Sequence, residues 1–247
     1  MATRLTGFAT VSGQDVASTS STQQMPIGSY METADGRGYR YALVGATATV
    51  PGKVYAAAVW TTSSLMPVGG LGLAAAALGA TQVTLTDSLT IAANQLAGGY
   101  LFINITPDQG YTYLVASNTA VSGATSCVVT LADPIVGAAL TTASKATIVK
   151  HPYDSIIVSP GGASTGQPVG VATTVITAAQ YGWIQTYGAC AVLAGVATSI
   201  SLPGVPVTPS ASTAGSVIVS TAILPTIGWA MQLMTATEYD GVFLTIH

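Results

Sequence analysis

Residues that could do chemistry are few in this chain, and they are scattered. His151 and Asp154 lie three positions apart, and together with one of the many serines they could in principle form a nucleophile–histidine–acid triad. The other histidine, His247, is the last residue of the sequence. Histidines and carboxylates gather nowhere into a cluster, so we interpret His151 as a structural residue between two domains. We expect no enzymatic activity.

A second candidate is the run Gly70-Leu-Gly72-Leu-Ala-Ala75, which fits the dinucleotide-binding pattern G-x-G-x-x-G/A. That motif works only where a buried strand leads into a helix, whereas the residues before it include Pro67 and are typical of a loop. The two histidines and two cysteines have no metal-ligand spacing. We therefore expect no cofactor and no bound metal.

Two further patterns concern carboxylates and aromatic residues. Glu238 and Asp240 are two positions apart, so an extended chain would place both on one face, which we interpret as a solvated strand edge. Tyr181, Trp183 and Tyr187 alternate in the same way, and a regular strand would give them one common face. Such a face could be a core or subunit-interface ridge, or it could be a platform for carbohydrate.

The composition indicates a protein that works in an assembly. Only 6% of residues are charged and the formal net charge is −3, which leaves little repulsion between copies. Six Lys and Arg residues spread along the chain cannot form a basic stripe, so we expect no nucleic-acid binding. Cys127 and Cys190 give no disulfide framework; buried free thiols and a single disulfide both remain open.

The uncharged stretch from Ser155 to Thr237 raises the question of a membrane. A spanning helix needs about 20 mostly apolar residues in succession. The most apolar windows, Val68–Ala80 and Tyr187–Val207, are short or broken by Gly, Pro, Ser and Thr. We expect no membrane partner.

Short runs rich in Val, Ile, Tyr and Thr recur along the chain, separated by turn residues, and this pattern indicates a sandwich or barrel. Helix is scarce; Gly72–Gly79 and Ile91–Ala97 could each form a short one. The expected strands are 38–44, 53–60, 82–86, 100–105, 111–116, 127–131, 146–149, 155–158, 173–176, 181–187, 216–220 and 242–246.

The predicted fold class is therefore all-β, with a sandwich or barrel base domain, an inserted smaller β domain and an extended arm. The polar residues 1–38 would form the N-terminal arm, because they offer little to bury. Residues 39–68 together with 151–247 would form the discontinuous base domain. Residues 69–150, which open with the Ala-rich stretch and end before His151, would form the inserted domain.

Several short motifs, in this order and spacing, resemble the capsid decoration (cement) proteins of tailed bacteriophages. The resemblance covers most of the chain from about Arg37 onward. The motifs are Arg37–Ala48, Gly52–Tyr55, Asn94–Tyr100, Gly110–Tyr113, Val171–Thr186, Ser212–Val217 and Ile227–Ala230.

The resemblance implies a virion structural protein on the capsid exterior, which binds the outer surface of an icosahedral head and stabilises contacts between capsomers. Its partners would be the major capsid protein and other copies of itself, commonly in a homotrimer. The alternative is a virion-associated adhesin module that binds host glycans through the aromatic face or the inserted domain. Candidate interface residues are Arg4, Arg37, Arg40, Tyr181, Trp183 and Tyr187.

Overall fold

The computed structural model describes residues 15–58, 67, 69–124, 126–162, 165–196, 199–220 and 225–246. Every regular element in these ranges is a strand, so the all-β prediction is confirmed. Neither short helix considered from the sequence is present: Gly72 ends a strand, and residues 93–98 form turns around the buried Leu96. Within the described ranges there is accordingly no helix that could cross a membrane.

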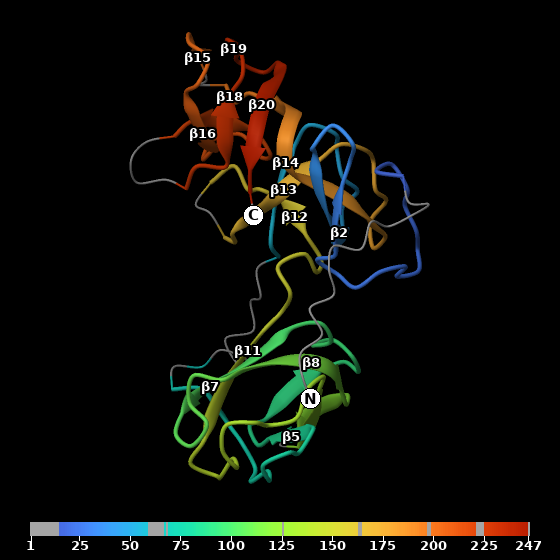
Figure 1. Cartoon of the computed structure of the whole chain (residues 1–247), viewed down its shortest axis with the longest axis vertical. Coiled ribbons are helices and arrows are strands. Elements are labelled where there is room, and N and C mark those ends of the chain that lie inside the picture. The colour runs from blue at the N-terminus through green and yellow to red at the C-terminus, as the bar shows by residue number, and fades with distance from the viewer. Residues whose placement is uncertain are drawn as a thin grey trace. The chain divides into compact units, whose positions relative to one another are not determined.

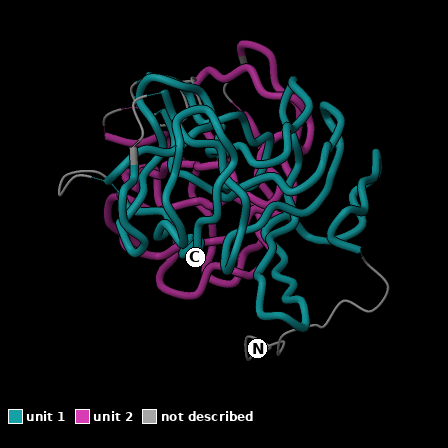
Figure 2. Tube along the Cα trace, turned by 90° about the horizontal axis from the view of Figure 1, so that it is seen from above, with its two compact units in different colours: residues 1–59, 152–247 teal, residues 60–151 magenta. Residues whose placement is uncertain are grey.

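The chain divides into two compact units (Figure 2). Unit 1 consists of Met1–Val59 and Pro152–His247, and unit 2 is Trp60–His151. The boundaries thus fall at 59/60 and 151/152, where we expected 68/69 and 150/151. Residues 15–38, which we assigned to an extended arm, belong to unit 1, and their last part forms a strand of its sheet.

Unit 1 contains two sheets, of which the larger has ten strands (Figure 1). Its strands are β1 (Tyr30–Glu32), β2 (Gly38–Leu43), β3 (Val54–Ala56), β12 (Ile157–Val158), β13 (Pro168–Ala172), β14 (Tyr181–Leu193), β16 (Pro206–Pro209), β17 (Val217–Val219), β18 (Gly228–Ala230) and β20 (Tyr239–Thr245). The smaller sheet pairs β15 (Ser199–Ile200) with β19 (Met234–Thr235).

Unit 2 is a six-stranded sheet that curls into a barrel, with a small two-stranded sheet beside it. Its order is β4-β11-β7-β8-β10-β5, and the edge strands meet where Leu73 forms a bridge with Leu85. Inward residues alternate with outward ones: in β5, Val83 and Leu85 are buried, whereas Gln82 is exposed and Thr84 is half-buried. The strands are β4 (Leu71–Gly72), β5 (Gln82–Leu85), β6 (Leu89–Ile91), β7 (Tyr100–Ile105), β8 (Thr112–Asn118), β9 (Val121–Ala124), β10 (Cys127–Leu131) and β11 (Lys145–Val149).

Strand β14 organises unit 1, because its two halves belong to two different cores. The first half pairs with β2 and β13, and a bridge from Val44 to Ile156 curls that half of the sheet around a core that contains Ile184. The second half pairs with β20, and a bridge from Ala194 to Val217 curls the other half around a second core. In Figure 1, β18 and β20 (red) lie beside β14 (orange).

Candidate functional site: an uncharged sheet face

A β-bulge in the middle of β14 decides which aromatic side chains reach the surface. Gln185 is opposite Tyr39 of β2, but Tyr187 is opposite the adjacent residue, Gly38. Paired residues share a face and adjacent residues have opposite faces, so Gln185 and Tyr187 point to opposite sides of the sheet. The prediction that Tyr187 shares a face with Trp183 is therefore wrong, because the extra residue in the bulge reverses the alternation.

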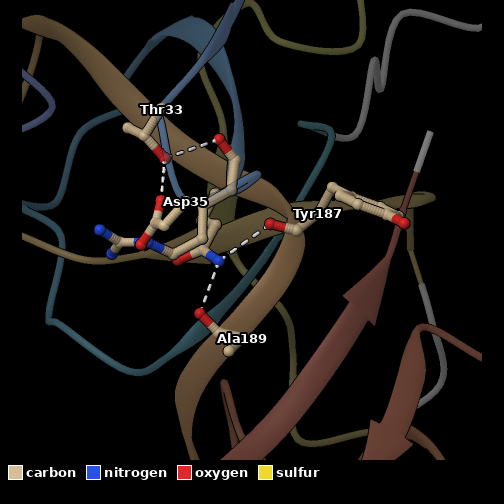
Figure 3. Close-up of polar contacts among 6 residues, drawn as sticks. Thr33, Asp35, Tyr187 and Ala189 are labelled. Carbon is tan, nitrogen blue, oxygen red and sulfur yellow. Dashed lines mark hydrogen bonds and ion pairs between the residues drawn. The ribbon is translucent and has the colours of Figure 1, made fainter.

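The buried side chain of Gln185 braces this bulge (Figure 3). Its amide nitrogen donates hydrogen bonds to the carbonyl oxygens of Tyr187 (3.0 Å) and Ala189 (2.9 Å). Gly188 has a φ of +86°, and a Cβ atom there would lie 3.1 Å from Cγ of Arg37. The conformation and the close approach both favour glycine at this position.

After the bulge, large apolar side chains gather on the outer face of β14, β20 and the β18 edge. We call this surface the platform and define it by Tyr187, Trp229, Met231, Tyr239 and Phe243. Trp229 and Phe243 are partners in the β18–β20 ladder, and the rings of Tyr187 and Phe243 are 5.2 Å apart, edge to face. Trp229, Met231 and Tyr239 are each about half exposed, at 46%, 50% and 51%.

Small residues form the floor between these side chains. Ala189 pairs with Phe243 and Ala191 pairs with Gly241, so the middle of the platform carries side chains of one carbon or none. A Cβ atom at Gly241 would lie 3.6 Å from Cβ of Met231, which places Met231 over this floor. Large rings around a low floor give a surface into which a partner's side chain can fit.

The platform carries no ionised side chain. Among β14, β18 and β20 the single charged residue is Asp240, which is buried and faces the other side of the sheet. Its carboxylate accepts hydrogen bonds from the side chain of Gln232 (2.8 Å) and the backbone N–H of Thr235 (2.9 Å). Our interpretation of Glu238 and Asp240 as a solvated edge is thus wrong for Asp240; Glu238 alone is exposed.

Two predicted interface residues, Tyr181 and Trp183, lie on the opposite face of the sheet. Trp183 has no exposed surface, and its ring packs edge to face on Tyr41 with 5.1 Å between centroids. The ring of Tyr181 also stacks on that of Tyr41, with 5.8 Å between centroids. Val16 and Met25, from the first described residues, pack against this cluster. Trp183 is therefore not available to a partner in this fold, because its own chain covers it.

The predicted arginines have separate surroundings. Arg4 lies outside the described residues. Nε of Arg37 forms an ion pair with Asp35 at 2.7 Å (Figure 3), and the hydrogen bond from the Thr33 hydroxyl, followed by that from Arg37, lowers the pKa of the Asp35 carboxyl. Arg40 donates from Nη1 to the carbonyl of Gly28 (2.9 Å), and its guanidinium carbon lies 5.2 Å from the Tyr30 ring centroid.

A shallow pocket of about 190 Å³ lies beside the bulge, but it assembles no catalytic groups. Arg37, Gln185 and Cys190 are among its lining residues. Burial raises the pKa of the Cys190 thiol to about 12, which keeps it protonated and a poor nucleophile at neutral pH. No group of three His, Cys, Asp or Glu residues in the described part of the chain could hold a metal ion.

The remaining chemical candidates have structural surroundings. The ring of His151 lies 5.9 Å from that of Tyr100, and Asp154 accepts a hydrogen bond from the hydroxyl of Ser155. The dinucleotide-like run contains a strand, β4, where the motif needs a helix. Both cysteines are buried and free, in separate cores.

Sequence reasoning missed one motif and most of the platform. The run 162–166 fits Gly-x-Ser-x-Gly by letter, although its Ala163 and Ser164 lie outside the described residues. The next element is a strand, β13, whereas a nucleophile elbow leads into a helix.

Trp229 and Phe243 each lie between two buried residues, an alternation that the sequence does contain. The sequence does not show that Trp229 and Phe243 are partners in neighbouring strands.

A second surface with aromatic side chains lies on the outside of unit 2. Tyr100 of β7 is opposite Leu114 of β8, and the ring of Phe102 lies 6.3 Å from that of Tyr100. Phe102 and Leu114 are 37% and 41% exposed. The side-chain amide of Asn104 borders these residues and donates to the Thr147 hydroxyl (2.7 Å).

Comparison with known proteins finds no family model, no curated protein and no solved structure that matches this chain.

Proposed function

We propose that this chain is a virion structural protein, a capsid decoration protein that binds the outer surface of an icosahedral phage head. The observation that carries the proposal is the platform. It is a surface of unit 1 whose five defining side chains are aromatic or thioether groups, three of them about half exposed and none of them charged. Surfaces of this composition are typical of the centre of protein–protein interfaces, where charged residues are depleted and aromatic residues and Met are enriched.

The low charge of the whole chain supports the same proposal. With 6% charged residues, a free copy has little electrostatic protection against association, and a face such as the platform gains stability when a partner covers it. On a symmetric shell, a modest contact repeated at many sites becomes collectively strong. We propose that copies also associate with each other as a homotrimer, which native mass spectrometry of the purified chain tests.

The decisive experiment is co-sedimentation of the purified chain with phage heads that lack it. Trp229→Asp introduces a charge at the platform, and docking would then bury that charge without a partner. We expect a loss of head binding of roughly a hundredfold or more, since an unpaired buried charge costs several kcal/mol and each 1.4 kcal/mol is tenfold.

The matched control is Val136→Asp, which places the same charge on an exposed residue of unit 2 and should leave binding unchanged. Both variants must keep the far-UV circular dichroism of the parent chain. Equal binding by the Trp229→Asp and parent chains would refute the role of the platform.

The second candidate function is an adhesin module that binds host glycans, and the outer face of unit 2 favours it. Tyr100 and Phe102 present aromatic rings, and Asn104 and Thr147 present polar groups beside them, which is the combination that sugar rings contact. A glycan array tests it: binding by the parent chain that is lost in Phe102→Ala supports an adhesin, and no binding by the parent chain rejects it.

A further inference from the structure

The first described residues form a strap across an aromatic site in unit 1. We define the strap as residues 15–29 and the acceptor as Tyr41, Tyr181 and Trp183. The Tyr41 ring contacts the rings of both Tyr181 and Trp183. Tyr41 and Trp183 are 2% and 0% exposed. Since three large rings gain stability from burial, the acceptor needs a cover at all times.

The strap covers the acceptor mainly through its backbone. Ser20 and Tyr181 exchange two hydrogen bonds, at 3.0 Å from the Ser20 N–H and at 2.8 Å from the Tyr181 N–H. The backbone N–H of Gln24 donates to the Tyr41 hydroxyl at 3.1 Å. Val16 and Met25 add apolar contacts. Every one of these contacts joins the strap to the acceptor, and none requires that both belong to one chain.

The fit between strap and acceptor is loose. A cavity of about 230 Å³ lies between them, lined by Ser18, Thr19, Ser20, Gln24 and Tyr41. The side chains at 21–24 are exposed. Asp15 is the single charged residue of the strap, and from Val16 to Met31 the sequence has no charge. An identical strap from a second copy would restore the burial of the acceptor.

The end of the strap is a glycine-containing turn. Gly28, two residues after Pro26, has a φ of +83°, a conformation that glycine adopts without strain. The Gly28 N–H donates to the Tyr41 carbonyl (2.8 Å), and the Tyr41 N–H donates to the Ser29 carbonyl (2.9 Å). These bonds hold the end of the strap on the sheet, so only residues 15–25 would have to move in an exchange.

We propose that the acceptor also takes the strap of a second copy of this chain, so that neighbouring copies are linked by strap exchange. The exchanged strap makes the same contacts as the chain's own strap, so the two arrangements differ only in the entropy of bringing the partners together. A short flexible tether gives an effective concentration of about 1 mM, so exchange competes when copies are held at that concentration or above. The proposal does not depend on binding to a phage head.

The test uses cysteines at the Ser20–Tyr181 bridge, where antiparallel partners lie close enough for a disulfide. Ser20→Cys chains are mixed with Tyr181→Cys chains at about 1 mM, the effective concentration above, and oxidised. Exchange predicts a covalent heterodimer on a non-reducing gel. The two native cysteines are buried and contribute no background in the parent chain.

The matched control is Thr22→Cys, an exposed position on the same strap that does not pair with the acceptor. Mixed with Tyr181→Cys, it should give roughly tenfold less heterodimer, since the residues are not held together by the bridge. If the double variant Ser20→Cys/Tyr181→Cys closes within one chain and the mixture of single variants gives no more heterodimer than this control, strap exchange is excluded.

A second measurement keeps the acceptor intact in case Tyr181→Cys does not fold. Thr19 lines the cavity over Tyr41, so a benzophenone side chain at position 19 should cross-link to the acceptor. Unlabelled chains that carry it are mixed with isotope-labelled parent chains at the same concentration and irradiated. Cross-linked peptides that join unlabelled strap to labelled acceptor support exchange, and exclusively unlabelled pairs contradict it.

Discussion

Replacing Gln185 tests whether its side chain stabilises the β-bulge of β14, which turns Tyr187 toward the platform. Gln185 is 1% exposed, and its amide nitrogen is the donor that ties together the two carbonyls of the bulge. In Gln185→Leu the volume is nearly kept, but both hydrogen bonds are lost and the carbonyls lose a buried donor. Each such bond contributes about 1 kcal/mol, with more lost where a buried acceptor stays unsatisfied, so we expect a destabilisation of roughly 2–3 kcal/mol.

The assay is urea unfolding followed by tryptophan fluorescence, because the buried Trp183 reports on unit 1. In a thermal scan the same loss corresponds to a decrease in Tm of roughly 4–12 °C for a unit of this size. The control is Gln167→Leu, an exposed glutamine in the same unit, which should change stability by less than about 0.5 kcal/mol. An unchanged midpoint for Gln185→Leu would show that the bulge holds without its brace, and would refute the stabilising role given to the Gln185 amide.

Two further predictions concern titratable groups. Burial, followed by the 2.5 Å hydrogen bond that its hydroxyl donates to Asp108, raises the pKa of Tyr113 from its usual 10 to about 12. Between pH 10 and 12 the unfolded chain therefore binds fewer protons than the folded one, so this contribution to the free energy of unfolding is complete below pH 10 and is lost as the pH rises to 12. In Tyr113→Phe the free energy of unfolding, measured by urea titrations followed by circular dichroism, should fall less steeply over this pH range. An equally steep fall in the variant would contradict the assignment. Burial also raises the pKa of both thiols, that of Cys190 to about 12. At pH 8 a disulfide reagent should therefore react more slowly with native Cys127 and Cys190 than with the denatured chain, by about a thousandfold at Cys190, because a rise of three pKa units lowers the thiolate fraction by that factor. Two rapidly reacting native thiols would show that they are accessible.

Many strands could be predicted from the sequence, because their side chains alternate and turn residues bound them. Residues 100–105 and 127–131 are strands β7 and β10 with the expected limits. The expected strand 173–176 is not one, although its composition is suitable. There the backbone N–H of Ile176 donates to the Thr49 hydroxyl (2.6 Å), and that hydroxyl donates to the carbonyl of Thr174 (2.9 Å). These side-chain contacts replace a strand partner, and they join residues more than 120 positions apart.

The platform was hidden from sequence reasoning for a related reason. Tyr187 was recognised, but regular alternation grouped it with Trp183. A single inserted residue reverses the orientation of every later side chain in a strand, and no local sequence signal marks the bulge at Gln185. Trp229 and Phe243 come together through pairing of β18 with β20, which depends on the whole sheet. Local pattern predicts which side chains alternate, whereas pairing and bulges decide which of them meet.

The place where unit 2 leaves unit 1 has a consequence for how such a protein can change over time. Ala56 and Ile157 are partners in the β3–β12 ladder, so the polypeptide departs from one strand of the sheet and returns to the adjacent strand. A short linker across that gap could therefore replace the whole of unit 2 without breaking any strand of unit 1. A different folded domain could be inserted at the same junction, by recombination or by protein engineering, without a change in unit 1.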